Sequence, residues 1–204
     1  MFRNVFRRRS PGSARRPARR FYRPRLESLE GRLVPAVDVW TGANNAIDLN
    51  WSDLKNWSLN AVPGASDTAE FTSGSLVKDA NSVVDTNFSI GALLIDGSWG
   101  STLTVNAALT LSGSSEWDSG LISLAQLSGT LTNNGSLALM GTGNVTLTGG
   151  GTFTNHGSVL QKNSGNLDLG GTSNVATTLN NAVNGTYNFQ ADSSINFGGG
   201  AGGV

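Results

Sequence analysis

Residues 129–137 read GTLTNNGSL, and residues 151–159 read GTFTNHGSV, which begins 22 residues later. Six of the nine positions are identical, and two of the other three exchange one apolar side chain for another. A looser third copy, TLNNAVNGTY, spans residues 178–187 and has two residues inserted before its glycine. Each copy therefore keeps apolar residues at alternate positions and then turns at an asparagine- and glycine-containing corner, which indicates short strands separated by tight turns.

Strands with the same spacing lie between the copies. Residues 144–147, NVTL, return 22 positions later as NLDL at residues 166–169. Earlier stretches such as residues 101–105, STLTV, alternate in the same way. A period of about 22 residues built from short strands fits one coil of a parallel β-helix. We therefore predict an all-β fold, a parallel β-helix (solenoid) with ~22-residue coils and asparagine ladders at its corners; a β-sandwich is the alternative.

The formal net charge of zero conceals two unlike parts. The first 36 residues hold eleven arginines against two glutamates, a net charge of +9, whereas three lysines and twelve acids give the rest −9. Such a basic segment with little to bury is predicted to be a disordered leader. We divide the chain into the leader (1–36), a Trp-rich capping segment (37–72), solenoid repeats (73–197) and a Gly-rich tail (198–204). A glycine run cannot cap a solenoid, so we expect the sequence to be a truncated piece of a longer repeat protein, the alternative being a flexible linker.

The end of the leader carries a family resemblance. Residues 25–36, RLESLEGRLVPA, resemble the amino-terminal signature RLExLExRxxPA of large predicted surface or secreted proteins of planctomycete bacteria, with Gly31 where Asp is usual. The apolar stretch of an ordinary secretory signal is missing. The resemblance implies export by a different leader, with cleavage expected between Ala36 and Val37.

The capping segment has a motif pattern of its own: W-x-G, W-x-D, N-W, P-G and D-x-A-x-F. This order is similar to the opening of bacterial extracellular β-solenoid proteins, including autotransporter-associated β-strand repeat proteins. We expect Trp40, Trp51 and Trp57 to cover the first coil, the Pro-Gly pair to form a turn, and Asp67 to accept hydrogen bonds from backbone amides. The same three tryptophans are the candidates for stacking on sugar rings if their faces are exposed.

Catalytic chemistry has little support in the sequence. The body has no arginine or cysteine, and its one histidine, His156, stands at a repeat corner where the earlier copy has Asn134. Two acid pairs are close in sequence, Asp79 with Asp85 and Glu116 with Asp118, but neither lies in a recognisable motif. We therefore predict no catalytic residue, no metal site and no cofactor.

These observations favour an exported, non-catalytic structural or adhesive protein, located outside the cell or on its surface, with extracellular polysaccharide or cell-envelope components as partners. One alternative is the amino-terminal part of a carbohydrate-active β-helix enzyme. A second is a binder of nucleic acid or another anionic surface through the basic leader, which the acidic body disfavours. No transmembrane segment is predicted, and the sequence indicates no oligomeric state.

Overall fold

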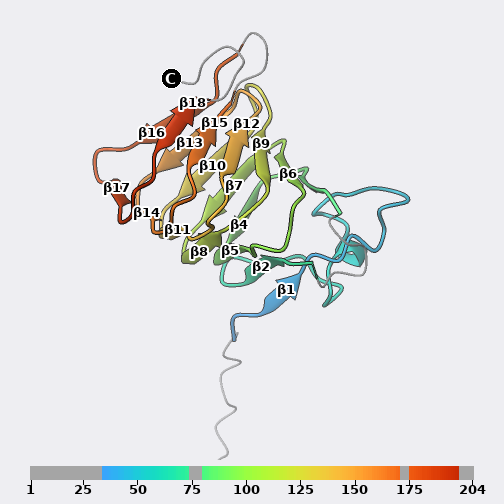
Figure 1. Cartoon of the computed structure of the whole chain (residues 1–204). Coiled ribbons are helices and arrows are strands. Elements are labelled where there is room, and N and C mark those ends of the chain that lie inside the picture. The colour runs from blue at the N-terminus through green and yellow to red at the C-terminus, as the bar shows by residue number, and fades with distance from the viewer. Residues whose placement is uncertain (1–33, 74–79, 171–174, 198–204) are drawn as a thin grey trace, which may run out of the picture. The chain divides into compact units, whose positions relative to one another are not determined.

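The computed structural model describes residues 34–73, 80–170 and 175–197. They belong to one compact unit, a solenoid of about five turns in which each complete coil contributes one strand to each of three parallel sheets (Figure 1). The tail and all of the leader before Val34 lie outside the described residues, so the prediction of a disordered leader is not addressed. Among the described residues, no helix has the length and apolar character needed to cross a membrane.

We number the three sheets in the order in which the chain enters them. Sheet 1 consists of β1 (Val37–Val39), β2 (Thr68–Phe71), β5 (Ala92–Ile95), β8 (Ser114–Trp117), β11 (Ser136–Leu139), β14 (Ser158–Gln161) and β17 (Thr186–Phe189). Sheet 2 consists of β3 (Ser82–Val84), β6 (Thr102–Val105), β9 (Leu121–Leu124), β12 (Val145–Thr148), β15 (Leu167–Leu169) and β18 (Ile195–Phe197). Sheet 3 consists of β4 (Phe88–Ile90), β7 (Ala108–Leu111), β10 (Thr130–Asn133), β13 (Thr152–Asn155) and β16 (Thr178–Asn181). The only described helix is a 3₁₀ turn, η1 (Leu54–Asn56).

The strand register reproduces the sequence repeat. Leu131 of β10 pairs with Phe153 of β13, and Leu137 of β11 pairs with Val159 of β14, so each residue lies beside its equivalent 22 positions away. The third copy pairs in the same order at longer offsets, 26 residues between β13 and β16 and 28 between β14 and β17, because four extra residues lie between β15 and β16 and two more at the corner between β16 and β17. The parallel β-helix prediction is confirmed, and the β-sandwich alternative is wrong.

Alternation along each strand places the core inside the coils. In most strands, buried residues alternate with half-buried ones, as in Thr130–Asn133, where Leu131 and Asn133 point inward. Stacking such strands gives columns of Leu, Ile, Val and Phe that run along the solenoid. Fully burying one such side chain contributes about 1.5–3 kcal/mol, so the columns supply most of the stabilisation that a single coil cannot provide alone.

The corner after each strand of sheet 3 requires glycine. Gly135 and Gly157 stack on successive coils, and a Cβ at either residue would collide with the carbonyl oxygen of the equivalent glycine on the preceding coil. The coils approach at the normal strand spacing of about 4.8 Å, so no side chain fits between these backbones. This contact explains why the glycine of the repeat recurs although its neighbour changes from Asn134 to His156.

The capping segment closes the amino-terminal end of the solenoid. Trp40, Trp51 and Trp57 are at most 1% exposed, and they pack edge to face on one another and against Phe71. The backbone of Trp51 also bonds to β3, since its amide donates to the carbonyl of Val83 at 2.8 Å. The predicted cap is confirmed. Because β1 and β2 belong to sheet 1, this segment and the repeats form one continuous structure.

A hydrogen-bonded turn joins the cap to the first coil. Asp67 accepts the amide of Gly64 at 2.8 Å through Oδ2 and the amide of Ala36 at 2.8 Å through Oδ1. These two bonds to backbone amides lower the pKa of the Asp67 carboxyl. The role expected for Asp67 is therefore confirmed, with Ala36 as an additional partner. The turn itself runs from Gly64 to Asp67, whose amide donates to Gly64 O at 3.0 Å, so it lies just after the predicted Pro-Gly position.

The inward asparagines of sheet 3 form the predicted ladder. Asn133 Nδ2 donates to Asn155 Oδ1 at 2.8 Å, and Asn155 Nδ2 donates to Asn181 Oδ1 at 2.7 Å. Asn133 and Asn155 also donate to the backbone carbonyls of Ser158 and Thr186. The ladder begins at Asn133, whose buried Oδ1 has no hydrogen-bond partner among the described residues, since the preceding coil has Leu111 in this column.

The ladder makes its two buried members unequal. In Asn155→Leu, Asn133 loses an acceptor while its own oxygen stays unpartnered, so we expect a loss of about 1–3 kcal/mol in the free energy of unfolding. Asn133→Leu extends the Leu111 column and only moves the unpartnered oxygen to Asn155, so its loss should be smaller. Urea unfolding of both variants measures this order. Equal losses would contradict a ladder that starts at Asn133.

Candidate functional site

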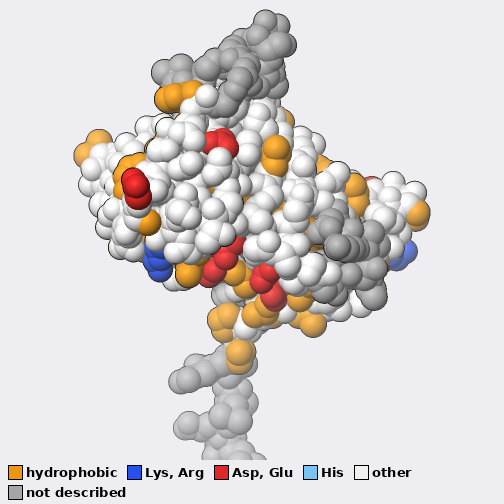
Figure 2. Space-filling view, in the orientation of Figure 1, with side chains coloured by type: hydrophobic (Ala, Val, Ile, Leu, Met, Phe, Trp, Pro, Cys, Tyr) orange, Lys and Arg blue, Asp and Glu red, His pale blue; other side chains and the backbone are white. Residues whose placement is uncertain are grey.

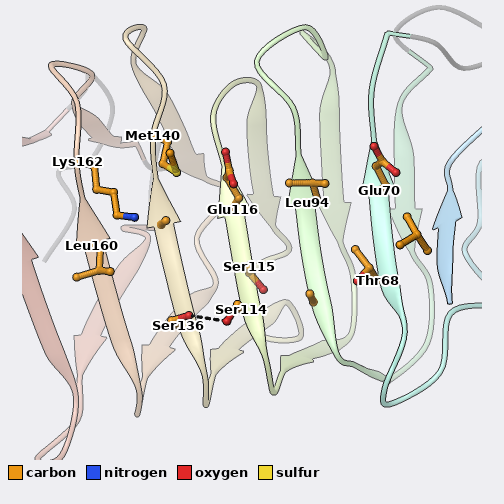
Figure 3. A pocket seen from close by; sticks show the side chains of 13 residues that line it. Thr68, Glu70, Leu94, Ser114, Ser115, Glu116, Ser136, Met140, Leu160 and Lys162 are labelled. Atoms are coloured by element: carbon orange, nitrogen blue, oxygen red, sulfur yellow. Dashed lines mark hydrogen bonds between the residues drawn. The ribbon is translucent and has the colours of Figure 1, made fainter. Parts of the chain in front are cut away.

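A groove of about 560 Å³ lies on the outer face of sheet 1 (Figure 3). It crosses successive coils from β1 to β14, perpendicular to the strands. In the space-filling view, acidic and apolar side chains alternate along the edge of the solenoid where sheet 1 lies (Figure 2). The residues that line the groove are Val37, Thr68, Glu70, Ala92, Leu94, Ser114, Ser115, Glu116, Ser136, Ala138, Met140, Leu160 and Lys162.

The strand register arranges these side chains in rows. One row, which we call the hydroxyl row, contains Thr68, Ala92, Ser114, Ser136 and Ser158. The next row outward along the strands, the mixed row, contains Glu70, Leu94, Glu116, Ala138 and Leu160. Neighbouring members of a row lie about 4.8 Å apart because each occupies an adjacent strand. The groove thus offers hydroxyl groups along one side and alternating carboxyl and apolar groups along the other.

In the middle of the groove, serine side chains add to the backbone hydrogen bonds between the strands of sheet 1. Ser115 points inward in a column otherwise filled by apolar residues such as Leu93 and Leu137, and it is 5% exposed. Its Oγ accepts the amide of Leu93 at 3.0 Å, while on the outer face Ser136 Oγ donates to Ser114 Oγ at 3.2 Å. Serine hydroxyls therefore connect the central strands both below and above the sheet.

Two carboxyl groups meet at one wall of the groove. The pKa of Glu116 is raised, first by its partial burial and then by a hydrogen bond and charge repulsion from Asp118, while Lys162 acts in the opposite direction. Asp118 is positioned by the backbone, since its Oδ1 accepts the amide of Met140 at 3.1 Å. Burial and the adjacent Asp118 therefore make Glu116 hold its proton more readily than an isolated glutamate does.

The adjacent acids do not have the spacing used in glycoside hydrolysis. Retaining and inverting glycosidases separate their two carboxyl groups by about 5–9.5 Å, so that a sugar or a water fits between them. Glu116 and Asp118 share a hydrogen bond, which leaves no such space. Among the described residues, no cluster of three or more His, Asp or Glu side chains could hold a metal ion. The groove therefore provides a surface of hydroxyl, apolar and acidic groups for contact with a ligand.

The proposed sugar-stacking role of Trp40, Trp51 and Trp57 is wrong. All three indoles lie inside the cap, so neither face of any ring can meet a sugar. Trp57 Nε1 donates to the backbone carbonyl of Trp51 at 2.9 Å, and Trp51 Nε1 donates to Ser82 Oγ at 2.6 Å. Burial against Phe71 gains more for these large rings than exposure on the surface would, which is why the capping alternative holds.

The remaining sequence candidates are dispersed. His156 is exposed at a corner, and its backbone amide donates to Asn133 O at 2.8 Å. Asp85 accepts hydrogen bonds from Ser52, whereas its proposed partner Asp79 lies outside the described residues. Neither His156 nor Asp85 lines the groove on sheet 1.

The expected cleavage point is part of the folded body. The amide of Ala36 donates to Asp67 and its carbonyl accepts the amide of Thr68 at 2.8 Å, so β1 starts directly beside the bond between Ala36 and Val37. A protease acting at this bond in the folded body would have to displace the two hydrogen bonds of Ala36.

Sequence reasoning did not identify the groove. The serines of its hydroxyl row, Ser114, Ser136 and Ser158, are outward residues at a spacing of 22, and this signal is present in the sequence. What marks the row as part of a groove is the mixed row of longer side chains beside it, and their height becomes visible only when the coils are stacked.

Comparisons of the chain with protein-family models, with curated proteins and with solved structures found no match.

The raised pKa of Glu116 makes a prediction about stability. A carboxyl group whose pKa is higher in the folded than in the unfolded chain stabilises the fold at low pH, and this contribution is lost as the pH rises through the folded-state value. Glu116→Gln should therefore resist urea better than the wild type at neutral pH and show no such gain below the ordinary pKa of glutamate. Glu70→Gln, in the same row, is the matched control. A gain in Glu116→Gln that does not change with pH would contradict the carboxyl pair.

Proposed function

We propose that this chain is an exported, non-catalytic structural or adhesive protein that acts outside the cell or at its surface. In this proposal, the groove on sheet 1 holds an extended polysaccharide or a similar cell-envelope polymer. The observation that carries the proposal is that the groove crosses β2, β5, β8, β11 and β14 with equivalent positions repeated on each coil. A site of this form suits a ligand that is itself a linear repeat.

The chemistry of the two rows supports a carbohydrate ligand. Sugar rings present hydroxyl groups at their edges and C–H groups on their faces. The hydroxyl row can exchange hydrogen bonds with ring hydroxyls, while Leu94, Ala138 and Leu160 offer apolar contact between them. Glu70 and Glu116 add acceptors in the same row. Because the rows are attached to a hydrogen-bonded sheet, little conformational freedom remains to be lost on binding.

Export rests on the leader. Its resemblance to planctomycete surface proteins covers residues 25–36, and its eleven arginines are segregated from an acidic body. Cleavage before Val37 would remove the two hydrogen bonds that Ala36 makes with Asp67 and Thr68, and the strand pairing that starts with Val37 and Thr68 would remain. The body therefore needs no residue before Ala36 to complete its sheets.

A carbohydrate-active enzyme is the second candidate, because of one observation. Glu70 and Glu116 lie in the mixed row with Leu94 between them, two strand spacings or about 10 Å apart at the backbone. This spacing is close to that of the acid and base of inverting glycosidases, and the raised pKa of Glu116 suits a general acid. Release of new reducing ends from a bound polysaccharide, abolished by Glu116→Gln, would replace the non-catalytic proposal with this one.

Ligand binding can be tested by filling the groove. Ala138→Trp places a bulky side chain in the middle of the mixed row, and we expect at least a tenfold weaker retention on insoluble polysaccharides and in glycan affinity gels. Thr154→Trp makes a similar enlargement on the outer face of sheet 3 and serves as the control, with circular dichroism to verify folding. Equal retention of both variants, or no retention of the wild type by any envelope or extracellular polysaccharide, would refute the groove as the site.

Export is tested separately, by cell fractionation and amino-terminal sequencing of the recovered protein. We expect the protein in the envelope or the medium, with Val37 as its first residue. Recovery only from the cytoplasm with the leader attached would overturn the export proposal and favour the binder that acts through its arginines.

A further inference from the structure

The groove on sheet 1 carries its charges unevenly. Among the described residues that line it, three are charged: Glu70, Glu116 and Lys162. Glu70 on β2 and Glu116 on β8 lie in the mixed row with Leu94 between them, whereas Lys162 lies at the far end of the groove, just after β14 (Figure 3). The two glutamates are half-buried and Lys162 is exposed. The part of the groove from β2 to β8 is therefore acidic.

The acidic part has little positive charge to balance it. The pKa of Glu116 is raised, first by its burial and then by Asp118, and Asp96 acts in the same direction. Among the described residues, Lys162 is the one basic side chain that opposes this effect, and it stands two strands further along the sheet. Residues 37–204 as a whole contain twelve acids, three lysines and no arginine. A positive group on a ligand would therefore stabilise the ionised form of Glu116.

This charge distribution distinguishes three classes of polysaccharide. A polymer of uronates or phosphates would place negative charges against Glu70 and Glu116, with no arginine in the body to neutralise them. An uncharged polymer would bury the two carboxyl groups with neutral hydroxyl donors only. A polymer that carries ammonium groups would give each carboxylate a charge-assisted hydrogen bond, which is stronger than a neutral one. Charge complementarity therefore favours amino sugars.

The spacing of the two glutamates suits alternate sugars of a β-1,4-linked chain. Glu70 and Glu116 are two strand spacings apart, roughly 10 Å at the backbone. In such a polymer each sugar is turned over relative to its neighbour, so a given substituent returns to the same side at every second sugar. Two sugars span about the same length as two strand spacings. Amino groups on alternate sugars can thus meet Glu70 and Glu116 in turn, while the sugar between them passes over Leu94.

We propose that the groove selects a polysaccharide of amino sugars whose amino groups are free and protonated, with Glu70 and Glu116 as the specificity-determining residues. This inference rests on the proposed function, because it names the class of ligand for the same groove. Each carboxylate accepts a hydrogen bond from one ammonium group. The hydroxyl row bonds to sugar hydroxyls, which all the candidate polymers possess, so it contributes affinity and leaves the choice between amine, N-acetyl and uronate to the two glutamates.

Matched oligosaccharides test the selection. Oligomers of glucosamine and of N-acetylglucosamine with equal length and linkage differ only at the amino group, and an oligogalacturonate carries the opposite charge. Each is titrated calorimetrically into the full chain at a slightly acidic pH, at which the amines are protonated. We expect the glucosamine oligomer to bind about tenfold more tightly than the N-acetylated one, and the oligogalacturonate most weakly. Equal or tighter binding of either of the other two oligomers would overturn the selection.

Single-charge variants assign the preference to the groove. Glu70→Gln and Glu116→Gln each remove one negative charge at nearly constant size, and we expect both to lose most of the preference for the amine while binding the N-acetylated oligomer like the wild type. Asp192→Asn removes one charge from an exposed residue between β17 and β18, outside the groove, and should keep the preference. Circular dichroism verifies folding. An equal loss in all three variants would show attraction by the overall charge of the body and overturn the assignment.

The outcomes distinguish this inference from the proposed function. If Ala138→Trp abolishes retention on polysaccharides while the wild type binds the amine and N-acetyl oligomers equally, the groove is the binding site but does not select amino sugars. If the wild type binds no glycan, or Ala138→Trp changes no binding, both proposals fail. A preference that survives in both glutamate variants would place the selecting charge outside the groove and overturn this inference alone.

Discussion

The parallel backbone ladder between successive coils is the constraint on which the whole structure depends. Each residue of β10 lies beside its equivalent in β13, so a residue that recurs every 22 positions stacks on its own copy one strand spacing away. Such residues form columns along the solenoid, and the neighbours within a column must be able to contact one another. Leucine and phenylalanine satisfy this by packing, Asn133 and Asn155 by donating to the next amide, and Gly135 and Gly157 by removing the Cβ that would collide.

The same rule creates functional surface on the outside. Outward residues repeat without the demand for close packing, so their rows vary more, as the change from Leu94 to Glu116 to Ala138 shows. A groove results where a row of small hydroxyl residues lies beside taller ones, and it runs along the solenoid because the rows do. The raised pKa of Glu116 is a local consequence, since partial burial at the wall of the groove and the neighbouring Asp118 both disfavour its charged form.

The backbone ladder has two ends among the described residues, and their outer strands have different surroundings. The amino-terminal end has indoles packed edge to face and a backbone bridge from Asn50 to Val83, which together cover core and edge. The carboxy-terminal end presents Tyr187 and Phe189 on an edge strand with polar groups directed outward. Within the described residues, the two ends of the solenoid therefore differ.

The sequence by itself determined the coil length, the parallel stacking and the asparagine ladder, because each depends on a spacing or a residue type that recurs along the chain. Only the tertiary structure decided that outward residues such as Ser114 and Leu160 line one groove, that Ser115 completes the ladder from below, and that Glu116 meets Asp118. It also showed Trp40, Trp51 and Trp57 to be buried, where the sequence allowed both burial and exposure. The physical reason is that a repeat specifies which residues become neighbours. The shape of the groove and the burial of each side chain depend instead on the sizes of side chains from several coils at once.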